Sequence, residues 1–462
     1  MHYFLGLLFI LPIKIQSQAS QDSASFFIRE IYRQSYQEEV GYQWLTTLSK
    51  EIGHRLSGSK GAAKAVAWTR SVLDSMGLDN VWLQELQVPY WERGEKEQVL
   101  MTSKNCGSVT LKAVALGNSE GSGPEGVSGE VIEVQTLDEL RAMSPEMVAG
   151  KIVFFNRPMD KSLPSMNSAY GGAVDQRAYG PPLAAQKGAV AAVVRSMSPR
   201  LDDHPHTGVT VFKTEDPKIP AVAISTNDAE LLSKSIKANP TTIYVRTTCG
   251  MKGEATSYNV IGEIKGSMYP DEVILVGGHL DSWDIGDGAH DDGAGCMQSM
   301  EVMYRLKKNG YKPLRTIRCV LFMNEENGLV GALKYAELAI AKKEYHVAAI
   351  ESDNGGHTPQ AFGCAAGADG LLDQHLSHMS TYMNLLEPYY IQLQAGGGGA
   401  DIGPLKPTAG ILIGLRPDNG RYYDYHHSEI DILENVHPRE LASGSAAMTS
   451  LVYLIDQYGI GK

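Results

Sequence analysis

The stretch VILVGGHLDSWDIGDGAHDDGAG, residues 273–295, decides the fold. It opens with an apolar run of the length of a buried strand, and this run ends at His279 and Asp281. A glycine-rich loop follows, and a helical pattern begins near Gly293. A strand that leads into a helix through a polar loop is the repeating unit of α/β proteins, and such proteins bind ligands beyond the carboxyl ends of their strands.

The same alternation continues to the end of the chain. Strand-like runs are separated by helix-like segments, and these runs are VILVGG, TIRCVLFMN, HVAAIES and GILIGL. The alternation predicts an α/β fold with a mainly parallel, mixed sheet flanked by helices. We assign residues 249–462 to the metal-binding part of this domain and residues 20–109 to its N-terminal part. Residues 20–40 are open to a second interpretation, as a removable pro-segment.

Residues 110–248 have a different pattern. After a Gly/Ser-rich break come short β-like runs, namely GEVIEV, KIVFFN, AVAAVVR, PAVAIS and TIYVR. They predict a smaller β-rich domain inserted into the larger one. The segment has few polar residues suited to catalysis. We interpret His204 and His206 as solvated loop residues rather than metal ligands.

The first residues suggest export from the cytoplasm. The apolar run Phe4–Ile13 is too short to cross a bilayer, and Ser17 and Ala19 supply the small residues of a cleavage site. We therefore expect a signal peptide at residues 1–19 and a secreted or otherwise exported protein, in the extracellular space, a periplasm or a lysosome. No later segment has 18 uninterrupted apolar residues, so no membrane span is expected.

Charge and cysteine usage narrow the function further. The net charge is −12, from 53 acidic and 41 basic residues, which argues against nucleic acid as a partner. The cysteines form no CxxC pair, which argues against a thiolate zinc site. Cys106 and Cys249 stand near the two ends of the inserted segment, and we hypothesise that they form a disulfide.

Acids and histidines gather where the strand-like runs end. These side chains are His279 and Asp281, then Glu325 and Glu326, then Asp353, and finally His426 and His427. Carboxylate and imidazole donors without thiolate suit zinc, manganese or a similar divalent ion. A calcium loop of the EF-hand type is the alternative, but Trp283 occupies a ligand position and the segment follows a strand. Of the adjacent pair Glu325 and Glu326, one can bind metal and the other can act in general acid–base catalysis.

The motifs HLDSWDIGDGAHDDGAG, FMNEENG, ESDNGG and YHHSEID resemble the co-catalytic dizinc exopeptidases of the carboxypeptidase Q family. The similarity extends over nearly all of the mature chain. It implies two Zn²⁺ ions per chain, a small peptide as substrate and a homodimer. It also implies that the inserted segment is a protease-associated domain. The sequence departs from the family pattern after His427, where it reads SEID.

The resemblance also implies a role for each site residue. His279 and Glu326 are terminal ligands to different metals, Asp291 bridges the metals, Asp353 and His427 complete the two sites, and Glu325 is the general base. Asp281 would fix the imidazole of His279, and Asp431 would do the same for His427. Whether His426 or His427 is the ligand stays open, with the spacing to Asp431 favouring His427.

We therefore expect a zinc-dependent dipeptidase or carboxypeptidase that hydrolyses dipeptides or short peptides with a metal-activated water. Tyr425 is a candidate for stabilising the oxyanion. An aminopeptidase with the same dizinc site is the first alternative, because the ligands do not reveal which peptide end is recognised. A receptor-like module without catalytic activity is the second alternative.

Overall fold

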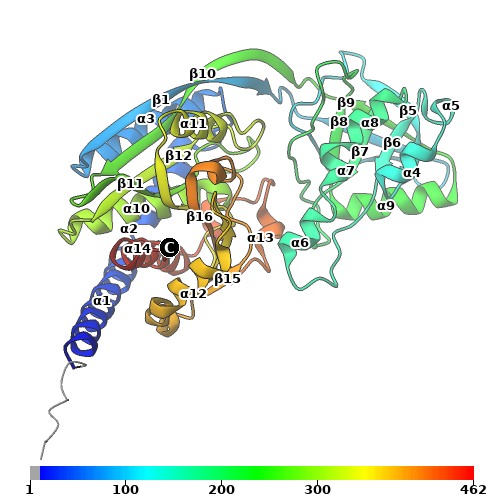
Figure 1. Ribbon diagram of the computed structural model, residues 1–462. Coiled ribbons are helices and arrows are strands. Elements are labelled where there is room, and N and C mark those ends of the chain that lie inside the picture. Colours follow the sequence, from blue (N-terminus) through cyan, green and yellow to red (C-terminus); the bar gives the residue numbers. More distant parts are fainter. Residues whose placement is uncertain (1–10, 462) are drawn as a thin grey trace, which may run out of the picture.

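The computed structural model describes residues 11–461 and contains two eight-stranded sheets with helices around each (Figure 1). The long strands β1 and β10 lead from the first sheet to the second across the top of the view. Residues 1–10, which form the first half of the expected signal peptide, lie outside the described residues. The leader therefore stays a prediction.

The main sheet has the order β1-β10-β12-β11-β13-β16-β14-β15. Its strands are β1 (Asn80–Glu92), β10 (Gly250–Ile264), β11 (Tyr269–His279), β12 (Arg315–Phe322), β13 (Tyr345–Glu351), β14 (Pro359–Ala366), β15 (Gln392–Ala395) and β16 (Ala409–Pro417). The central strands β12, β11, β13 and β16 are parallel to one another. Both flanks of the sheet carry antiparallel pairs, β1 with β10 and β14 with β16. The predicted mainly parallel, mixed sheet is confirmed.

Helices cover both faces of this sheet, which explains why its central strands are apolar on both sides. Along β11, Ile274 and Val276 face one core, whereas Val273 and Leu275 face the other. The first core lies under α1 (Leu11–Glu38), α3 (Lys60–Ser75), α10 (Ala294–Lys308) and α14 (Pro438–Tyr458). The second core lies under α11 (Val330–Ala341). The remaining helices of this half include α2 (Val40–Thr46) and α12 (Leu372–Met383).

Part of α1 belongs to the main core. Ile28 and Ile31 are buried there, and Tyr32 stacks on Tyr389 with ring centroids 3.6 Å apart. At the end of the helix, Glu38 pairs with the fully buried Arg305 of α10. Removal of residues 20–40 as a pro-segment would therefore expose core and deprive a buried guanidinium of a partner.

The second sheet has the order β3-β2-β9-β5-β6-β7-β8-β4. Its strands are β2 (Gln98–Ser103), β3 (Gly107–Thr110), β4 (Ala113–Ala115), β5 (Val127–Val134), β6 (Ile152–Phe155), β7 (Ala191–Arg195), β8 (Ala221–Ile224) and β9 (Thr241–Arg246). All five predicted β-like runs are strands of this sheet. The sheet also takes in β2 and β3, which begin before residue 110, where we expected the insertion to begin.

The inserted unit is also richer in helix than its sequence suggested. Its helices are α4 (Leu137–Ala142), α5 (Pro145–Val148), α6 (Met166–Gly171), α7 (Asp175–Ala178), α8 (Gly180–Gln186) and α9 (Thr226–Ala238). Most of them are too short for a clear helical periodicity. Separate apolar clusters lie on the two faces of the sheet, so the unit has its own core. Its assignment as a protease-associated domain stays a prediction.

The hypothesis of a disulfide between Cys106 and Cys249 is wrong, because all five cysteines are free. Cys106 is exposed at the turn between β2 and β3, with its sulfur 2.9 Å from Oγ of Ser103. Cys249 is buried beyond the end of β9, in a small cluster with Trp91 and Trp283. The two thiols flank the insertion in sequence but face different surroundings in the fold.

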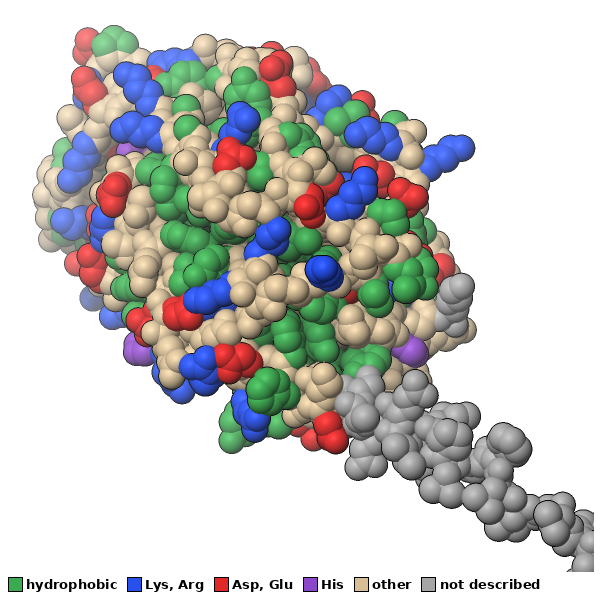
Figure 2. Space-filling model, turned by 90° about the vertical axis from the view of Figure 1, so that its left-hand side faces the viewer, with side chains coloured by type: hydrophobic (Ala, Val, Ile, Leu, Met, Phe, Trp, Pro, Cys, Tyr) green, Lys and Arg blue, Asp and Glu red, His purple; other side chains and the backbone are tan. Residues whose placement is uncertain are grey.

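Within residues 11–461, no helix combines the length and the hydropathy that crossing a bilayer requires. On the face of the molecule shown in Figure 2, acidic and basic side chains are interspersed with apolar ones. The acidic excess of the chain is therefore not concentrated on that face.

Candidate metal centre

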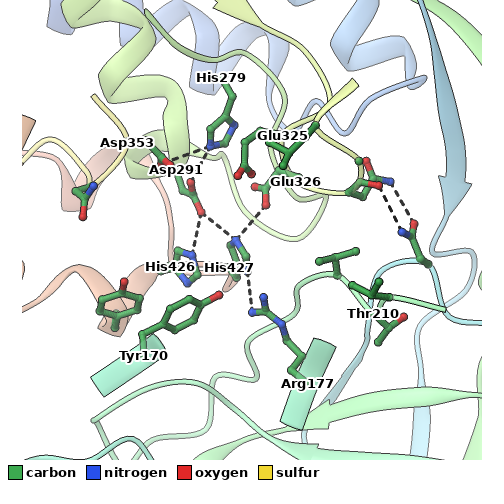
Figure 3. Close-up of a pocket in the computed structure, with 18 of the residues that line it drawn as sticks. Tyr170, Arg177, Thr210, His279, Asp291, Glu325, Glu326, Asp353, His426 and His427 are labelled. Atoms are coloured by element: carbon green, nitrogen blue, oxygen red, sulfur yellow. Dashed lines mark hydrogen bonds and ion pairs between the residues drawn. The ribbon is translucent and has the colours of Figure 1, made fainter. Parts of the chain in front are cut away.

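The predicted ligands meet at the carboxyl edge of the parallel strands (Figure 3). His279 is the last residue of β11, Glu325 and Glu326 follow β12, and Asp353 follows β13. His427 comes after the short helix α13 (Tyr422–Tyr425), which follows β16. Parallel strands end at one edge of their sheet, so residues distant in sequence converge there.

Asp291 lies between two groups of donors. Its Oδ1 is 3.2 Å from Nε2 of His279, which is itself 3.5 Å from Oδ1 of Asp353. Its Oδ2 is 3.2 Å from Nε2 of His427, which is 3.0 Å from Oε2 of Glu326. The donor atoms of His279, Asp291 and Glu326 all lie within 4.8 Å of one another. One carboxylate thus presents each of its oxygens to a different imidazole–carboxylate pair.

The charges of these residues depend on one another. Burial opposes ionisation of Asp291, but hydrogen bonds from His279 and His427 outweigh it and hold the pKa of this carboxyl well below its usual value. Burial likewise opposes a charge on His279, but Asp291 and Asp353 raise its pKa well above the usual range. The pKa of His427 is raised against burial in the same way, by Glu326 and Asp291. The cluster therefore attracts positive charge strongly.

Glu325 belongs to the cluster without pairing to an imidazole. Burial raises the pKa of its carboxyl well above the usual value, and the charges of Asp353 and Glu326 add to this effect against the opposing charge of His279. The side chain is partly exposed, to the cavity that the cluster opens into. A carboxyl group with a raised pKa beside a reaction site is suited to accept and return a proton.

The donor set fits zinc. It offers imidazole nitrogen and carboxylate oxygen in two groups that share one carboxylate, and both kinds of donor bind Zn²⁺. Four acidic side chains and two imidazoles gather here, so the cluster would carry a net negative charge with all four carboxyls ionised. Divalent cations would supply the missing positive charge.

The geometry favours His427 over His426 as the metal ligand. His427 reaches both Asp291 and Glu326, whereas Nε2 of His426 is 3.5 Å from Asp291 alone. His426 stacks on His427 with ring centroids 3.6 Å apart, and its ring also packs edge-on to Tyr170. His426 therefore supports the neighbouring ring by packing.

Asp281 acts differently from what the sequence led us to expect. The ring of His279 donates from Nδ1 to the main-chain carbonyl of Asp281, at 2.9 Å, rather than to its carboxylate. The carboxylate instead accepts hydrogen bonds from the backbone N–H groups of Asn324, Glu325 and Glu326, at 2.7, 3.1 and 3.4 Å. Asp281 thus fixes the loop that carries Glu325 and Glu326.

The expected role of Asp431 also changes. Its carboxylate accepts from the backbone N–H groups of His290 and Asp291, at 2.7 and 3.1 Å, so it holds the loop of the shared carboxylate. The ring of His427 instead lies with Nδ1 3.3 Å from the main-chain oxygen of Thr207. The sequence spacing was compatible with either contact, because it does not show which loop packs against which.

Two further residues position the loop of Asp291, and sequence reasoning missed both. Asp292 accepts at 3.0 Å from the backbone N–H groups of His279 and of Gly295. Arg55 is fully buried and donates to three main-chain carbonyls of the loop at 2.6 to 2.8 Å. Arg55 comes from a segment far away in sequence, and its own neighbourhood gave no signal of this contact.

The inserted unit clamps the loop of His426 and His427. His206 is buried and donates from Nδ1 to the main-chain oxygen of His426 at 2.6 Å. The backbone N–H of Thr207 donates to the main-chain oxygen of His427 at 2.8 Å. The interpretation of His206 as a solvated residue is therefore wrong. Only His204, half-exposed and 2.8 Å from Glu429, fits it. The clamp holds His427 at a φ of 61°, which non-glycine residues rarely adopt.

The cluster opens into a cavity of about 760 Å³ between the two units. The inserted unit lines it with Asn118, Asn167, Tyr170, Arg177, Phe212 and Lys218, and the main domain adds Asn354, Tyr422 and Tyr423 to the metal-site residues. Tyr425, our candidate for stabilising an oxyanion, is not among the lining residues. Its ring stacks on His290 with centroids 5.4 Å apart, outside this cavity.

The chain has clear relatives among known proteins. Residues 259–452 match the sequence profile of Peptidase family M28. Carboxypeptidase Q of Mus musculus is 33% identical over 445 residues, which is 96% of this chain and 91% of that protein. The chain belongs to peptidase family M28. Carboxypeptidase Q of Homo sapiens is 34% identical over 417 residues, or 90% of this chain and 84% of that protein.

Solved structures of family M28 agree with the fold. The peptidase M28 precursor from Shewanella amazonensis SB2B is 32% identical and has a TM-score of 0.88, with 94% of this chain and 97% of that chain covered. BSAP, a zinc aminopeptidase from Bacillus subtilis, shares the fold at a TM-score of 0.65 and 20% identity, with 90% and 94% covered. As a family M28 member, the chain is a metallopeptidase.

Proposed function

We propose that this M28 peptidase is a zinc-dependent exopeptidase that removes single residues from dipeptides or short peptides, as a dipeptidase or carboxypeptidase. The observation that carries the proposal is the position of Asp291, one oxygen toward each of two imidazole–carboxylate pairs. The names of its carboxypeptidase Q relatives support the choice of reaction. The cavity volume is in the range of sites for small ligands.

Two zinc ions would be held in this arrangement. His279, Asp353 and Asp291 would hold one ion, and His427, Glu326 and Asp291 would hold the other. Bound zinc supplies a water of lowered pKa and polarises the peptide carbonyl. The protein contributes the fixed orientation of the donors, through the carbonyl of Asp281 on one ring and that of Thr207 on the other.

Glu325 is the proposed general base. It would accept the proton of the attacking water and then deliver it to the nitrogen of the leaving amine, so that the carboxyl group ends each cycle in its starting state. The position of Glu325 is maintained by the hydrogen bond from its backbone N–H to Asp281. Its carboxyl faces the cavity and leaves metal binding to Glu326.

The test combines zinc analysis with hydrolysis of a panel of free dipeptides. The protein should contain two zinc ions per chain, and Glu325→Gln should keep both while kcat falls by roughly 10²- to 10⁴-fold. Glu337→Gln, at an exposed glutamate of α11, is the matched control and should keep full turnover. Full turnover by Glu325→Gln would show that another group is the base. Protein without zinc would instead revive the receptor-like alternative.

An aminopeptidase remains the second candidate, favoured by the shared fold with the zinc aminopeptidase BSAP. Dipeptides blocked at one end separate the two. An aminopeptidase should reject N-acetylated peptides and accept C-terminal amides, and a carboxypeptidase should do the opposite.

Three further features belong to this proposal. Residues 1–19 would direct the chain out of the cytoplasm, the inserted unit would be a protease-associated domain, and the active form would be a homodimer. N-terminal sequencing of the secreted protein tests the first, and its mass in solution by light scattering tests the last.

A further inference from the structure

Arg177 lies in the wall of the cavity opposite the metal ligands. It belongs to α7 of the inserted unit and points toward His427, with Tyr170 beside it (Figure 3). Only 4% of the residue is exposed, and its guanidinium carbon is 5.6 Å from the centre of the Tyr170 ring. The guanidinium is therefore largely buried but faces the space in which a peptide would bind.

Arg177 has no carboxylate partner among residues 11–461. The buried Arg55 also has none there, but it donates to three main-chain carbonyls at 2.6 to 2.8 Å, and the other buried arginines have carboxylate partners. Arg305 pairs with Glu301, Arg195 with Glu230, and Arg318 with Glu263. Arg177 has only the main-chain oxygen of Thr207 at 3.3 Å and Nδ1 of His427 at 3.4 Å, and its own Nε has no acceptor. Buried charges in proteins are normally paired, so this one calls for a partner from outside the chain.

The contact with Nδ1 of His427 would not satisfy the guanidinium once metal is bound. A His427 that binds through Nε2 must carry its proton on Nδ1, where the oxygen of Thr207 can accept it. That Nδ1 can then no longer accept a hydrogen bond from Arg177. With the metal site loaded, the donors of Arg177 are available for an anion.

The charges around the cavity favour a carboxylate over an amine. All four acidic residues that line it, Asp291, Glu325, Glu326 and Asp353, belong to the metal cluster. The basic lining residues are Arg177 and Lys218. Outside the cluster, the lining residues offer a carboxylate two cations and an ammonium group no acidic side chain.

The spacing between Arg177 and the metal cluster suits a leaving group of one residue. A single imidazole ring separates Arg177 from Glu326, since Nδ1 of His427 faces the first and Nε2 the second. In a peptide substrate, one residue separates the scissile carbonyl from the terminal carboxylate, a span of roughly 3.3 to 3.6 Å along the chain. A substrate carbonyl at the cluster would place its terminal carboxylate within reach of the guanidinium.

We propose that Arg177 binds the C-terminal carboxylate of the peptide and is the residue on which selectivity for a free C-terminus depends. This inference rests on the proposed peptidase function and adds the residue that recognises the C-terminal end of the peptide. The planar guanidinium can bind both oxygens of a carboxylate in parallel, which an ammonium group cannot do. Arg177 comes from the inserted unit, so the two halves of the chain would divide substrate binding and hydrolysis.

The experiment compares a free dipeptide with its C-terminal amide. In the wild-type enzyme, kcat/KM should be higher for the acid by roughly 10- to 100-fold, the range of a hydrogen-bonded charged contact. Arg177→Gln should reduce this preference to within a few-fold, mainly through a higher KM for the acid, and should leave the low rate on the amide nearly unchanged. Arg177→Lys should retain part of the preference, because it keeps the charge but loses the planar fork.

Lys218→Met is the matched control, since it removes the other cation of the cavity. Lys218→Met should keep the preference for the acid over the amide. If this preference were lost in Lys218→Met and kept in Arg177→Gln, the carboxylate would be assigned to Lys218. Zinc content, measured for every variant, separates a lost contact from a damaged metal site. Should Arg177→Gln fail to fold, the acid preference of the wild-type enzyme and of Arg177→Lys still tests whether Arg177 binds the carboxylate.

The possible failures are distinguishable. A zinc-loaded wild-type enzyme that hydrolyses no dipeptide contradicts the proposed peptidase function itself. A wild-type enzyme that hydrolyses acid and amide equally well contradicts only the role of Arg177. Equal losses on acid and amide in the Arg177 variants would also overturn the proposal, because they would indicate a structural effect on the ligand loop.

Discussion

The contact between His206 and the ligand loop gives the sharpest prediction about the metal site. His206 reaches from the inserted unit to the main-chain oxygen of His426 at 2.6 Å, next to the proposed ligand His427. Burial lowers the pKa of His206 to about 3, so its ring is neutral near neutral pH and carries the donated proton on Nδ1. The perturbation is His206→Leu, which places an apolar side chain in the same buried space and removes the donor.

The expected loss of zinc affinity follows from leaving one buried acceptor, the main-chain oxygen of His426, without its donor. A buried carbonyl left without a donor costs roughly 1–3 kcal/mol, which corresponds to about 5- to 150-fold in an equilibrium constant. Residues that orient metal ligands typically change metal affinity by about 10- to 100-fold. The effect should fall on the ion proposed to bind His427 and Glu326, because the other proposed histidine ligand, His279, is oriented by Asp281 within the main domain.

The assay is zinc content at a series of buffered free-zinc concentrations. His206→Leu should lose one of two zinc ions at a free-zinc concentration roughly 10- to 100-fold higher than the wild type does, and should keep the other. His206→Asn is the control, since its amide can place a donor near the position of Nδ1, and it should retain most of the affinity. Equal weakening of both ions, or the same result for Leu and Asn, would refute this reasoning.

The other predictions concern the fold and the charges that support it. Asp281→Asn should lower the free energy of unfolding by roughly 2–3 kcal/mol and weaken zinc binding at Glu326, because the carboxylate of Asp281 accepts hydrogen bonds from three backbone N–H groups. Chemical denaturation and zinc analysis check this. A zinc chelator should lower Tm, and added zinc should restore it; at a free-zinc concentration 100-fold above Kd, zinc should add about 2.7 kcal/mol to the free energy of unfolding, and no change would mean that zinc does not bind the folded state. Under native conditions a thiol reagent should label Cys106 alone, and all five cysteines after unfolding; labelling of fewer than five in the unfolded, unreduced chain would reveal a disulfide. Burial lowers the pKa of His346 to about 4, so the folded chain resists a proton that the unfolded chain takes up near pH 6.5. Stability should fall by up to about 3 kcal/mol as pH drops from 6.5 to 4, and His346→Gln should lose this part of the pH dependence.

The sequence predicted the main domain well because its signals are local. Each central strand is an apolar run, and His279, Glu326 and Asp353 stand at or shortly after the end of such a run, so one rule of parallel sheets brings them together. Asp291 and His427 stand farther along the segments that follow β11 and β16. The strands β10, β14 and β15 were missed. β14 reads PQAFGCAA and has no β-branched residue, and β15 has four residues, so neither resembles a strand by composition.

Contacts between the two units could not be predicted in the same way. Arg177, His206 and Thr207 stand in an insertion without a catalytic motif, and their importance depends on how that insertion packs against the loop of His427. The role of Asp281 was misjudged for a related reason. Spacing places its carboxylate near the ring of His279 but does not show that the backbone carbonyl of the same residue is closer to the ring nitrogen.

The ribbon of β1 and β10 has a consequence for how the enzyme is assembled. It is the covalent link between the units (Figure 1). Its pairing is interrupted by a register shift between Tyr90 and Trp91. Across the cavity, the units meet where His206 and Thr207 hold the loop of His427. Anything that fastens this loop from the metal side must, by thermodynamic reciprocity, also favour docking of the insertion. Zinc binding would thus also complete the surface that binds the peptide. Catalytic activity and peptide selectivity would then arise together.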